Sequence, residues 1–171
     1  AYKVHPYRWA AIGLTTEHIA SASPDDVGEF YRTHYHPSNA ILSISADIPE
    51  ERTIALCEKW FDPIADNPQP AASLPQEPPQ TESRREEVER NVPATMIVLA
   101  YHIGSRTSPD FFLGDMTSDL LAGGESGRLY QHLVREQRLL GSVNAYVSGE
   151  VDPVLFVFTA QLLPSTTVEQ A

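Results

Sequence analysis

A proline-rich stretch in the middle of the chain limits what this sequence can fold into. Six prolines lie between Asp62 and Gln80, namely Pro63, Pro68, Pro70, Pro75, Pro78 and Pro79. Proline has no backbone N–H and a fixed φ angle, so such a stretch favours an extended polyproline II conformation over a helix or a central strand. The sequence therefore predicts a semi-rigid linker over residues 62–80, with separately packed parts at residues 1–61 and 81–171.

The part before the linker combines helices with a strand. Ser23 is a typical N-cap and Pro24 a typical first-turn residue, which predicts a helix over residues 23–35. The apolar run at residues 40–46 predicts a strand, and a second helix is expected from about Pro49 onwards.

The part after the linker has more strands. Strands are expected at residues 84–91, 95–103, 143–149 and 154–162, and helices from Pro109 to a glycine-rich turn and over residues 128–139. Helices packed on one face of mainly antiparallel sheets define the α+β class. The sequence therefore predicts an α+β fold.

Charge and length exclude several classes of partner. The chain has 12 basic and 23 acidic residues, a net charge of −11, and no basic stripe, which excludes a nucleic-acid-binding protein. No apolar run approaches the roughly 20 residues of a membrane span. The chain starts without a basic and apolar leader, so either the protein is cytoplasmic or the piece that carries a leader is missing. Cytoplasm and bacterial periplasm are the expected compartments.

Metal ligation and nucleophilic catalysis find little support in the residues. His34 with His36, and His132 with Glu136, each supply only two ligands, whereas catalytic zinc needs three from the protein. Packing on neighbouring side chains is the simpler interpretation of these histidines. The single cysteine, Cys57, is expected on an apolar helix face as an inert thiol. We therefore expect no metal site in this chain.

The segment Gly123-Gly124-Glu125-Ser126-Gly127 allows two interpretations. Glycines before a helix can cradle a phosphate group. However, the Lys-Ser/Thr of a P-loop is missing, and the Glu125 carboxylate would repel an anion. A tight turn between two helices is the favoured interpretation.

Two stretches resemble the pitrilysin/insulinase family of zinc metallopeptidases, which includes the mitochondrial processing peptidases. The first begins with H-P-Y at His5 and ends with F-Y-R-T-H-Y-H-P-S-N-A at Ala40. The second is L-L-A-G-G-E-S-G-R-L-Y-Q-H-L-V-R-E, from Leu120 to Glu136. The resemblance implies two related domains joined by the proline linker, of which this chain holds the end of the first and the start of the second.

The resemblance also implies a function. A full-length parent would be a zinc-dependent endopeptidase that encloses and hydrolyses peptides, while this chain lacks the H-x-x-E-H zinc motif, binds no zinc and is inactive alone. Substrate peptide would contact the glycine-rich turn at Gly123, Gly124, Ser126 and Arg128. The alternative is a non-catalytic subunit of the same fold that acts in assembly or substrate capture, with a homodimeric or heterodimeric partner subunit.

One feature of the family separates these two hypotheses. Active members carry an Arg and a Tyr seven positions apart in the second domain. Arg135 matches the arginine as a catalytic candidate, but position 142 is Ser142, and Tyr146 lies four residues further on. Either a partner supplies the contacts that the Arg and Tyr of active members make with the substrate, or the second domain is non-catalytic. In the simplest interpretation, Arg135 only forms a weak pair with an acidic neighbour on the surface of its helix.

Overall fold

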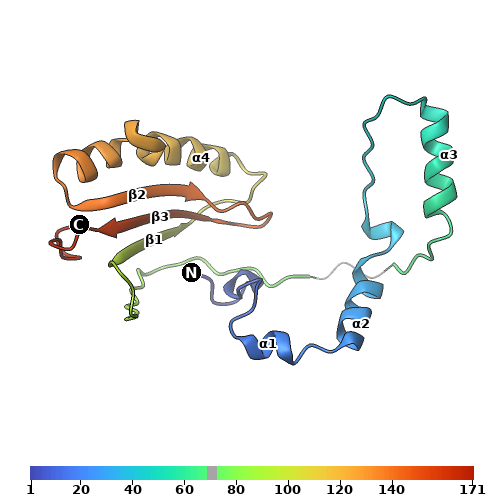
Figure 1. The fold of residues 1–171 in the computed structure, drawn as a ribbon, viewed down its shortest axis with the longest axis horizontal. Coiled ribbons are helices and arrows are strands. Elements are labelled where there is room, and N and C mark those ends of the chain that lie inside the picture. The colour runs from blue at the N-terminus through green and yellow to red at the C-terminus, as the bar shows by residue number, and fades with distance from the viewer. Residues whose placement is uncertain (69–72) are drawn as a thin grey trace. The chain divides into compact units, whose positions relative to one another are not determined.

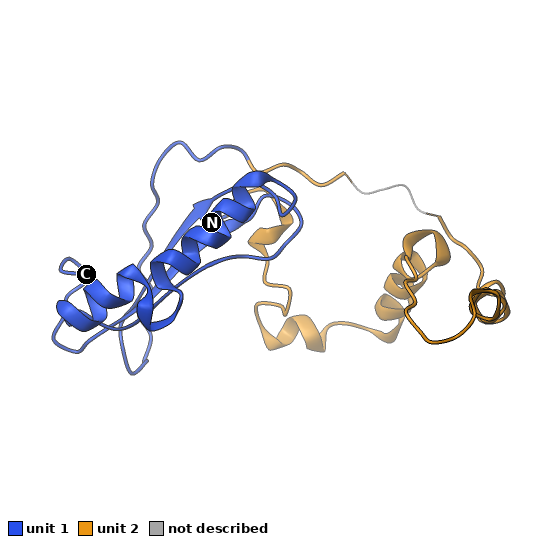
Figure 2. Cartoon of the chain, turned by 90° about the horizontal axis from the view of Figure 1, so that it is seen from above, with its two compact units in different colours: residues 1, 78–171 blue, residues 2–77 orange. Residues whose placement is uncertain are grey.

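The computed structural model describes residues 1–68 and 73–171, which form two compact units (Figure 1, Figure 2). The N-terminal unit is Tyr2–Glu77, and the C-terminal unit is Pro78–Ala171 together with Ala1. Pro70 of the expected linker lies outside the described residues. The limits of two related partial domains and of a linker at residues 62–80 stay a prediction.

Helices are the regular elements described in the N-terminal unit. They are the 3-10 helices η1 (Pro6–Arg8) and η2 (Pro37–Asn39) and the α-helices α1 (Thr16–Ala20), α2 (Pro24–His34) and α3 (Glu50–Phe61). At the start of α2, the Ser23 hydroxyl accepts a hydrogen bond from the Asp26 N–H, and the Asp26 carboxylate accepts one from the Ser23 N–H. This reciprocal cap satisfies two backbone donors that a helix start leaves unpaired. The predictions of a helix at residues 23–35 and of another after Pro49 are confirmed.

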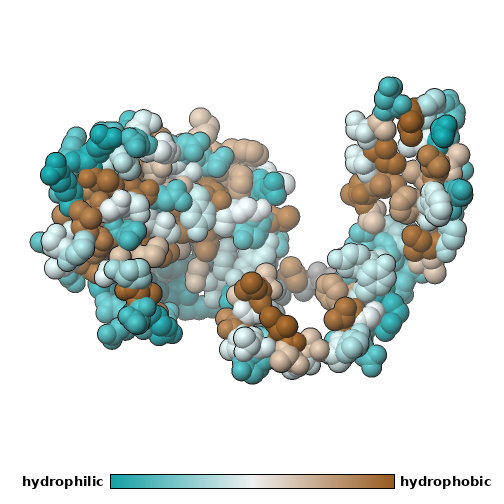
Figure 3. All heavy atoms as spheres, in the orientation of Figure 1, coloured by the Kyte–Doolittle hydropathy of each residue, from teal (hydrophilic) through white to brown (hydrophobic). Residues whose placement is uncertain are grey.

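The strands predicted at residues 40–46 and 84–91 are wrong. Both segments are described without strand structure, and Ile41 is 98% exposed. An apolar, β-branched run favours an extended backbone, but a strand exists only where a neighbouring strand pairs with its N–H and C=O groups. Apolar side chains consequently remain on the surface of the N-terminal unit, over α3 and the segment that precedes it (Figure 3).

The C-terminal unit contains an antiparallel sheet with helices on one face (Figure 1). Its elements are β1 (Met96–His102), α4 (Pro109–Ala122), the 3-10 helix η3 (Gly124–Ser126), the π-helix η4 (Tyr130–Glu136), β2 (Leu140–Val147) and β3 (Leu155–Leu162). The strand order is β1-β3-β2, so β3 is central and pairs Phe156 with Tyr101 on one side and Val147 on the other. The predicted α+β class is confirmed.

The centre of this unit lies between α4 and the sheet. Ala122 of α4, Ala145 of β2 and Phe156 of β3 are buried together. Half-buried apolar residues pack around them, namely Ile103, Leu121, Val147 and Phe158. This core fixes the end of α4 against the sheet.

Small residues make the close approach of α4 possible. A Cβ atom added at Gly114 would lie 3.1 Å from Ile103 Cδ1 and 3.2 Å from Val147 Cγ2. Ser118 and Ala122, four and eight residues further on, are 3% and 6% exposed. The helix therefore packs through a face of small side chains on larger ones from the sheet.

The larger apolar residues of α4 lie elsewhere on the helix. Phe112, Met116 and Leu120, which share helical spacing in the sequence, are 59%, 72% and 54% exposed.

Across residues 1–68 and 73–171, no helix combines the length and apolar character needed to cross a bilayer.

The packing of α4 leads to a prediction about stability. Gly114→Val should lower the free energy of unfolding by about 1–3 kcal/mol, because the added methyl groups overpack the contact with Ile103, Val147 and Phe156. Met116→Val on the exposed side of α4 is the control, and should cost only about 0.5 kcal/mol of helix propensity. Urea denaturation of both variants provides the measurement. Equal stability of the Gly114→Val and wild-type proteins would contradict the packing described.

Candidate functional site

The glycine-rich turn follows directly from the end of α4. The Gly123 N–H donates to the Asp119 carbonyl at 2.8 Å, and a Cβ at Gly123 would lie only 2.4 Å from that oxygen. Gly124 has a φ of +70°, a left-handed conformation that costs residues with a side chain more than glycine. The segment is thus a tight connection between helices, as the favoured interpretation of the sequence predicts.

The helix after the turn is wound as a π-helix rather than an α-helix. The Gln137 N–H donates to the His132 carbonyl, five residues earlier, at 2.9 Å. A helix is found where the sequence predicts one over residues 128–139, but its regular part ends at Glu136. π-Helices are rare in proteins, and those that do occur often lie at functional sites.

The π-helical winding brings Arg135 next to Tyr130. In an α-helix, residues five apart point about 140° away from each other, whereas i→i+5 winding places them nearly one above the other. The Arg135 guanidinium accordingly lies 5.9 Å from the centre of the Tyr130 ring. Residue spacing in the sequence could not reveal this pair, because the interpretation of such spacing assumes an α-helix.

Arg135 is also paired with the glycine-rich turn. Its Nη2 donates to Glu125 Oε2 at 2.7 Å. The hydrogen bond to Glu125, followed by that to Tyr130, raises the pKa of Arg135 above its ordinary value. The interpretation of Arg135 as the partner of an acidic side chain is therefore what the structure shows, with the acid in the turn rather than on the same helix.

The other residues predicted for the site lie close to this pair or on β2. Gly123, Gly124 and Ser126 are exposed in the turn, and Arg128 is exposed directly after it. Ser142 and Tyr146 lie on β2, where the uninterrupted register from Ser142 onwards places them on the same face. Sequence reasoning missed Glu125 and Tyr130 as the neighbours of Arg135. The catalytic and substrate-binding roles of the predicted residues stay predictions.

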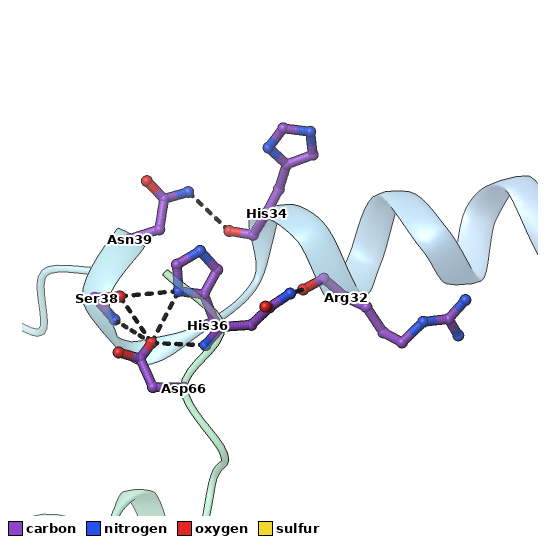
Figure 4. A network of polar contacts seen from close by, with 7 residues as sticks. Arg32, His34, His36, Ser38, Asn39 and Asp66 are labelled. Atoms are coloured by element: carbon purple, nitrogen blue, oxygen red, sulfur yellow. Dashed lines mark hydrogen bonds and ion pairs between the residues drawn. The ribbon is translucent and has the colours of Figure 1, made fainter. Parts of the chain in front are cut away.

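A second polar cluster, in the N-terminal unit, contains a serine, a histidine and an aspartate (Figure 4). His36 Nδ1 lies 2.9 Å from Asp66 Oδ1 and 3.1 Å from Ser38 Oγ, while Ser38 Oγ donates to Asp66 at 2.7 Å. In a catalytic triad, serine and aspartate contact opposite nitrogens of the histidine. Here both contact Nδ1, so the cluster holds the chain after α3 against η2 and is not a nucleophile site.

The predicted histidine pairs are engaged with neighbouring side chains. The rings of His34 and Phe30 are 4.4 Å apart, and His132 Nδ1 lies 3.0 Å from Glu136 Oε2. Over the described ranges 1–68 and 73–171, no three His, Cys, Asp or Glu side chains are grouped to hold a metal ion. The described residues therefore do not fit a catalytic zinc site.

The Asp66 cluster predicts a dependence of stability on pH. Hydrogen bonds from Ser38 and then His36 lower the pKa of Asp66 to about 2. A carboxylate whose folded pKa is depressed stabilises the fold above its usual pKa near 3.8, and this contribution is lost as the pH falls towards 2. The stability difference between wild type and Asp66→Asn should therefore shrink over that range.

Urea unfolding at several pH values, with NMR titration of the Asp66 carboxyl carbon, measures this dependence. Asp47→Asn, which removes an exposed carboxylate of the same unit, is the control. An Asp66 titration midpoint at or above 3.8 would contradict the prediction.

Comparison with known proteins shows which family this chain resembles. The family model described as "Peptidase M16 inactive domain" matches residues 21–171. The zinc protease PqqE of Helicobacter pylori is 28% identical over 172 residues, which cover 99% of this chain and 38% of that protein. An uncharacterized zinc protease of Streptomyces coelicolor is 25% identical over 156 residues, covering 88% of this chain and 34% of that protein.

A solved structure agrees with these relatives. The crystal structure of a protease from Helicobacter pylori matches with a TM-score of 0.86 and 27% identity, covering 98% of this chain and 41% of that chain. This chain therefore spans less than half the length of the relatives that it matches. The resemblance to zinc metallopeptidases inferred from the sequence motifs is confirmed: the chain belongs to the M16 peptidase family, in which it matches the inactive domain.

Proposed function

We propose that this chain is part of a zinc-dependent endopeptidase that encloses and hydrolyses peptides, and that it forms chamber wall and a substrate-contacting turn. The observation that carries the proposal is the exposed glycine-rich turn, joined to the π-helix by the Glu125–Arg135 pair. Relatives named as zinc proteases support the zinc chemistry, which residues outside this chain would supply in the full-length protein.

The turn has the properties needed to contact a peptide backbone. An added Cβ at Gly124 would find no atom within 4 Å, so the space over this residue is open. Ser126 and Arg128 are exposed beside it and carry hydrogen-bond donors for peptide carbonyl oxygens. In the proposed function, these residues bind and orient the peptide, and no bond is broken by the residues of this chain.

The alternative is a non-catalytic subunit of the same fold that captures substrate or assembles with a homodimeric or heterodimeric partner. Ser142 favours this alternative, because a serine on β2 cannot present a phenol to the reacting carbonyl. The two hypotheses share peptide binding at the turn. They differ in whether the full-length protein cleaves the bound peptide by itself.

The open space at Gly124 leads to a prediction about how one added methyl group at this position changes peptide binding. Gly124→Ala should weaken peptide binding by about five- to tenfold, because the left-handed backbone at this position disfavours a side chain and the turn must shift. Fluorescence anisotropy with a labelled unfolded peptide measures the affinity. Gly149→Ala is the matched control, because a Cβ there also meets no atom within 4 Å and its φ is not positive. Equal loss of affinity in both variants would argue against the turn as the contact.

Kinetics of the full-length protein separate the roles of Arg135. We expect Arg135→Ala to raise KM while kcat stays within about threefold, because an arginine that only binds peptide contributes equally to the ground and transition states. The assay is steady-state cleavage of an unfolded peptide by the zinc-loaded parent, alone and with any partner subunit. A large loss of kcat in the parent alone would instead assign Arg135 to the chemical step.

A further inference from the structure

We infer that Glu125 determines which peptides the glycine-rich turn accepts, by shielding the charge of Arg135 so that neutral peptide groups are favoured over carboxylates. This inference rests on the proposed function, since it assumes that peptide contacts the turn. It adds the class of substrate: segments without an acidic side chain at the position that faces Arg135.

The geometry of the pair shows why shielding is its main effect. The Glu125 carboxylate contacts Arg135 through Nη2 at 2.7 Å, and the Arg135 side chain remains 56% exposed. A guanidinium has five N–H donors in a fixed plane. Glu125 therefore neutralises the charge of the group while much of its surface stays accessible to a peptide carbonyl.

The backbone of Glu125 is joined to the following helix by one hydrogen bond, and a second hydrogen bond joins that helix to the end of the turn. Its backbone carbonyl accepts a hydrogen bond from Gln131 Nε2 at 2.5 Å, and the Gln131 N–H donates to the Gly127 carbonyl at 2.9 Å. These contacts fasten the turn to the first residues of the π-helix. On that helix, the Tyr130 ring lies beside the Arg135 guanidinium. The backbone that carries the Glu125 side chain is thus fastened to the helix that carries Arg135.

The net charge of the chain acts in the same direction, against the attraction of the exposed Arg128. Glu136, the acid of the π-helix itself, lies beside His132, and the chain as a whole carries a net charge of −11. A peptide carboxylate that approaches Arg135 meets the Glu125 carboxylate at the same position. A peptide carbonyl carries no charge and meets no such repulsion.

The experiment uses the full 171-residue chain and two labelled unfolded peptides that differ only by Glu or Gln at their centre. Wild type should bind the Gln peptide more tightly. Glu125→Gln should bind the Glu peptide about two- to fivefold more tightly than wild type does, a gain of the size typical of exposed charge pairs. Its affinity for the Gln peptide should be unchanged. The gain should largely disappear at about 0.5 M salt, where exposed charges are screened.

Two variants serve as controls. Glu125→Asp keeps the charge and should keep the wild-type preference. Glu87→Gln removes the acid of another exposed ion pair in the same unit, that with Arg85, and should leave both affinities unchanged. Circular dichroism establishes that each variant is folded.

The outcomes separate this inference from the function on which it rests. Absence of binding of either peptide to folded wild type would overturn the proposed function, and the inference with it. Binding of both peptides with the same ratio in wild type and Glu125→Gln would overturn the inference alone. Equal loss of both peptides in Glu125→Gln would also overturn it, and would make Glu125 a support of the turn.

Discussion

The close packing of α4 on the sheet is the constraint on which the C-terminal unit depends. Gly114 brings the helix axis near Ile103 and Val147, and the buried Phe156 ring fills the space beside Ala122. Because dense packing allows little rearrangement, the last turn of α4 has one position relative to β2 and β3. The glycine-rich turn begins there, so its place on the molecule is a consequence of this core.

After the end of α4, the candidate site is formed by the conformation of the backbone rather than by buried side chains. Gly123 lies where a Cβ would clash with the Asp119 carbonyl, Gly124 adopts a left-handed backbone, and the π-helix then places Arg135 over Tyr130. Glu125 joins the two elements through its side chain and its backbone carbonyl. The charged groups of this arrangement are largely exposed to solvent.

Carboxylates have a related structural role in the N-terminal unit, where few side chains are buried. Asp66 accepts hydrogen bonds from the Ser38 hydroxyl and backbone, and Glu77 accepts them from the N–H groups of Lys3, Val4 and His5 at 2.6–2.9 Å. A charged acceptor strengthens such hydrogen bonds. Each carboxylate therefore connects segments that are far apart in the sequence, over 28 residues for Asp66 and more than 70 for Glu77.

The sequence by itself determined the elements whose signals are local. The Ser23 cap, the proline at the start of α4 and the apolar run of β1 each act within a few residues, and each predicted its element correctly. The glycine-rich motif likewise located the turn of the candidate site. Only the tertiary structure decided which extended segments pair as strands, which face of α4 is buried, and that Arg135 meets Glu125 and Tyr130. Those outcomes depend on partners distant in the chain and on a π-helical winding, and neither strand propensity nor α-helical spacing contains that information.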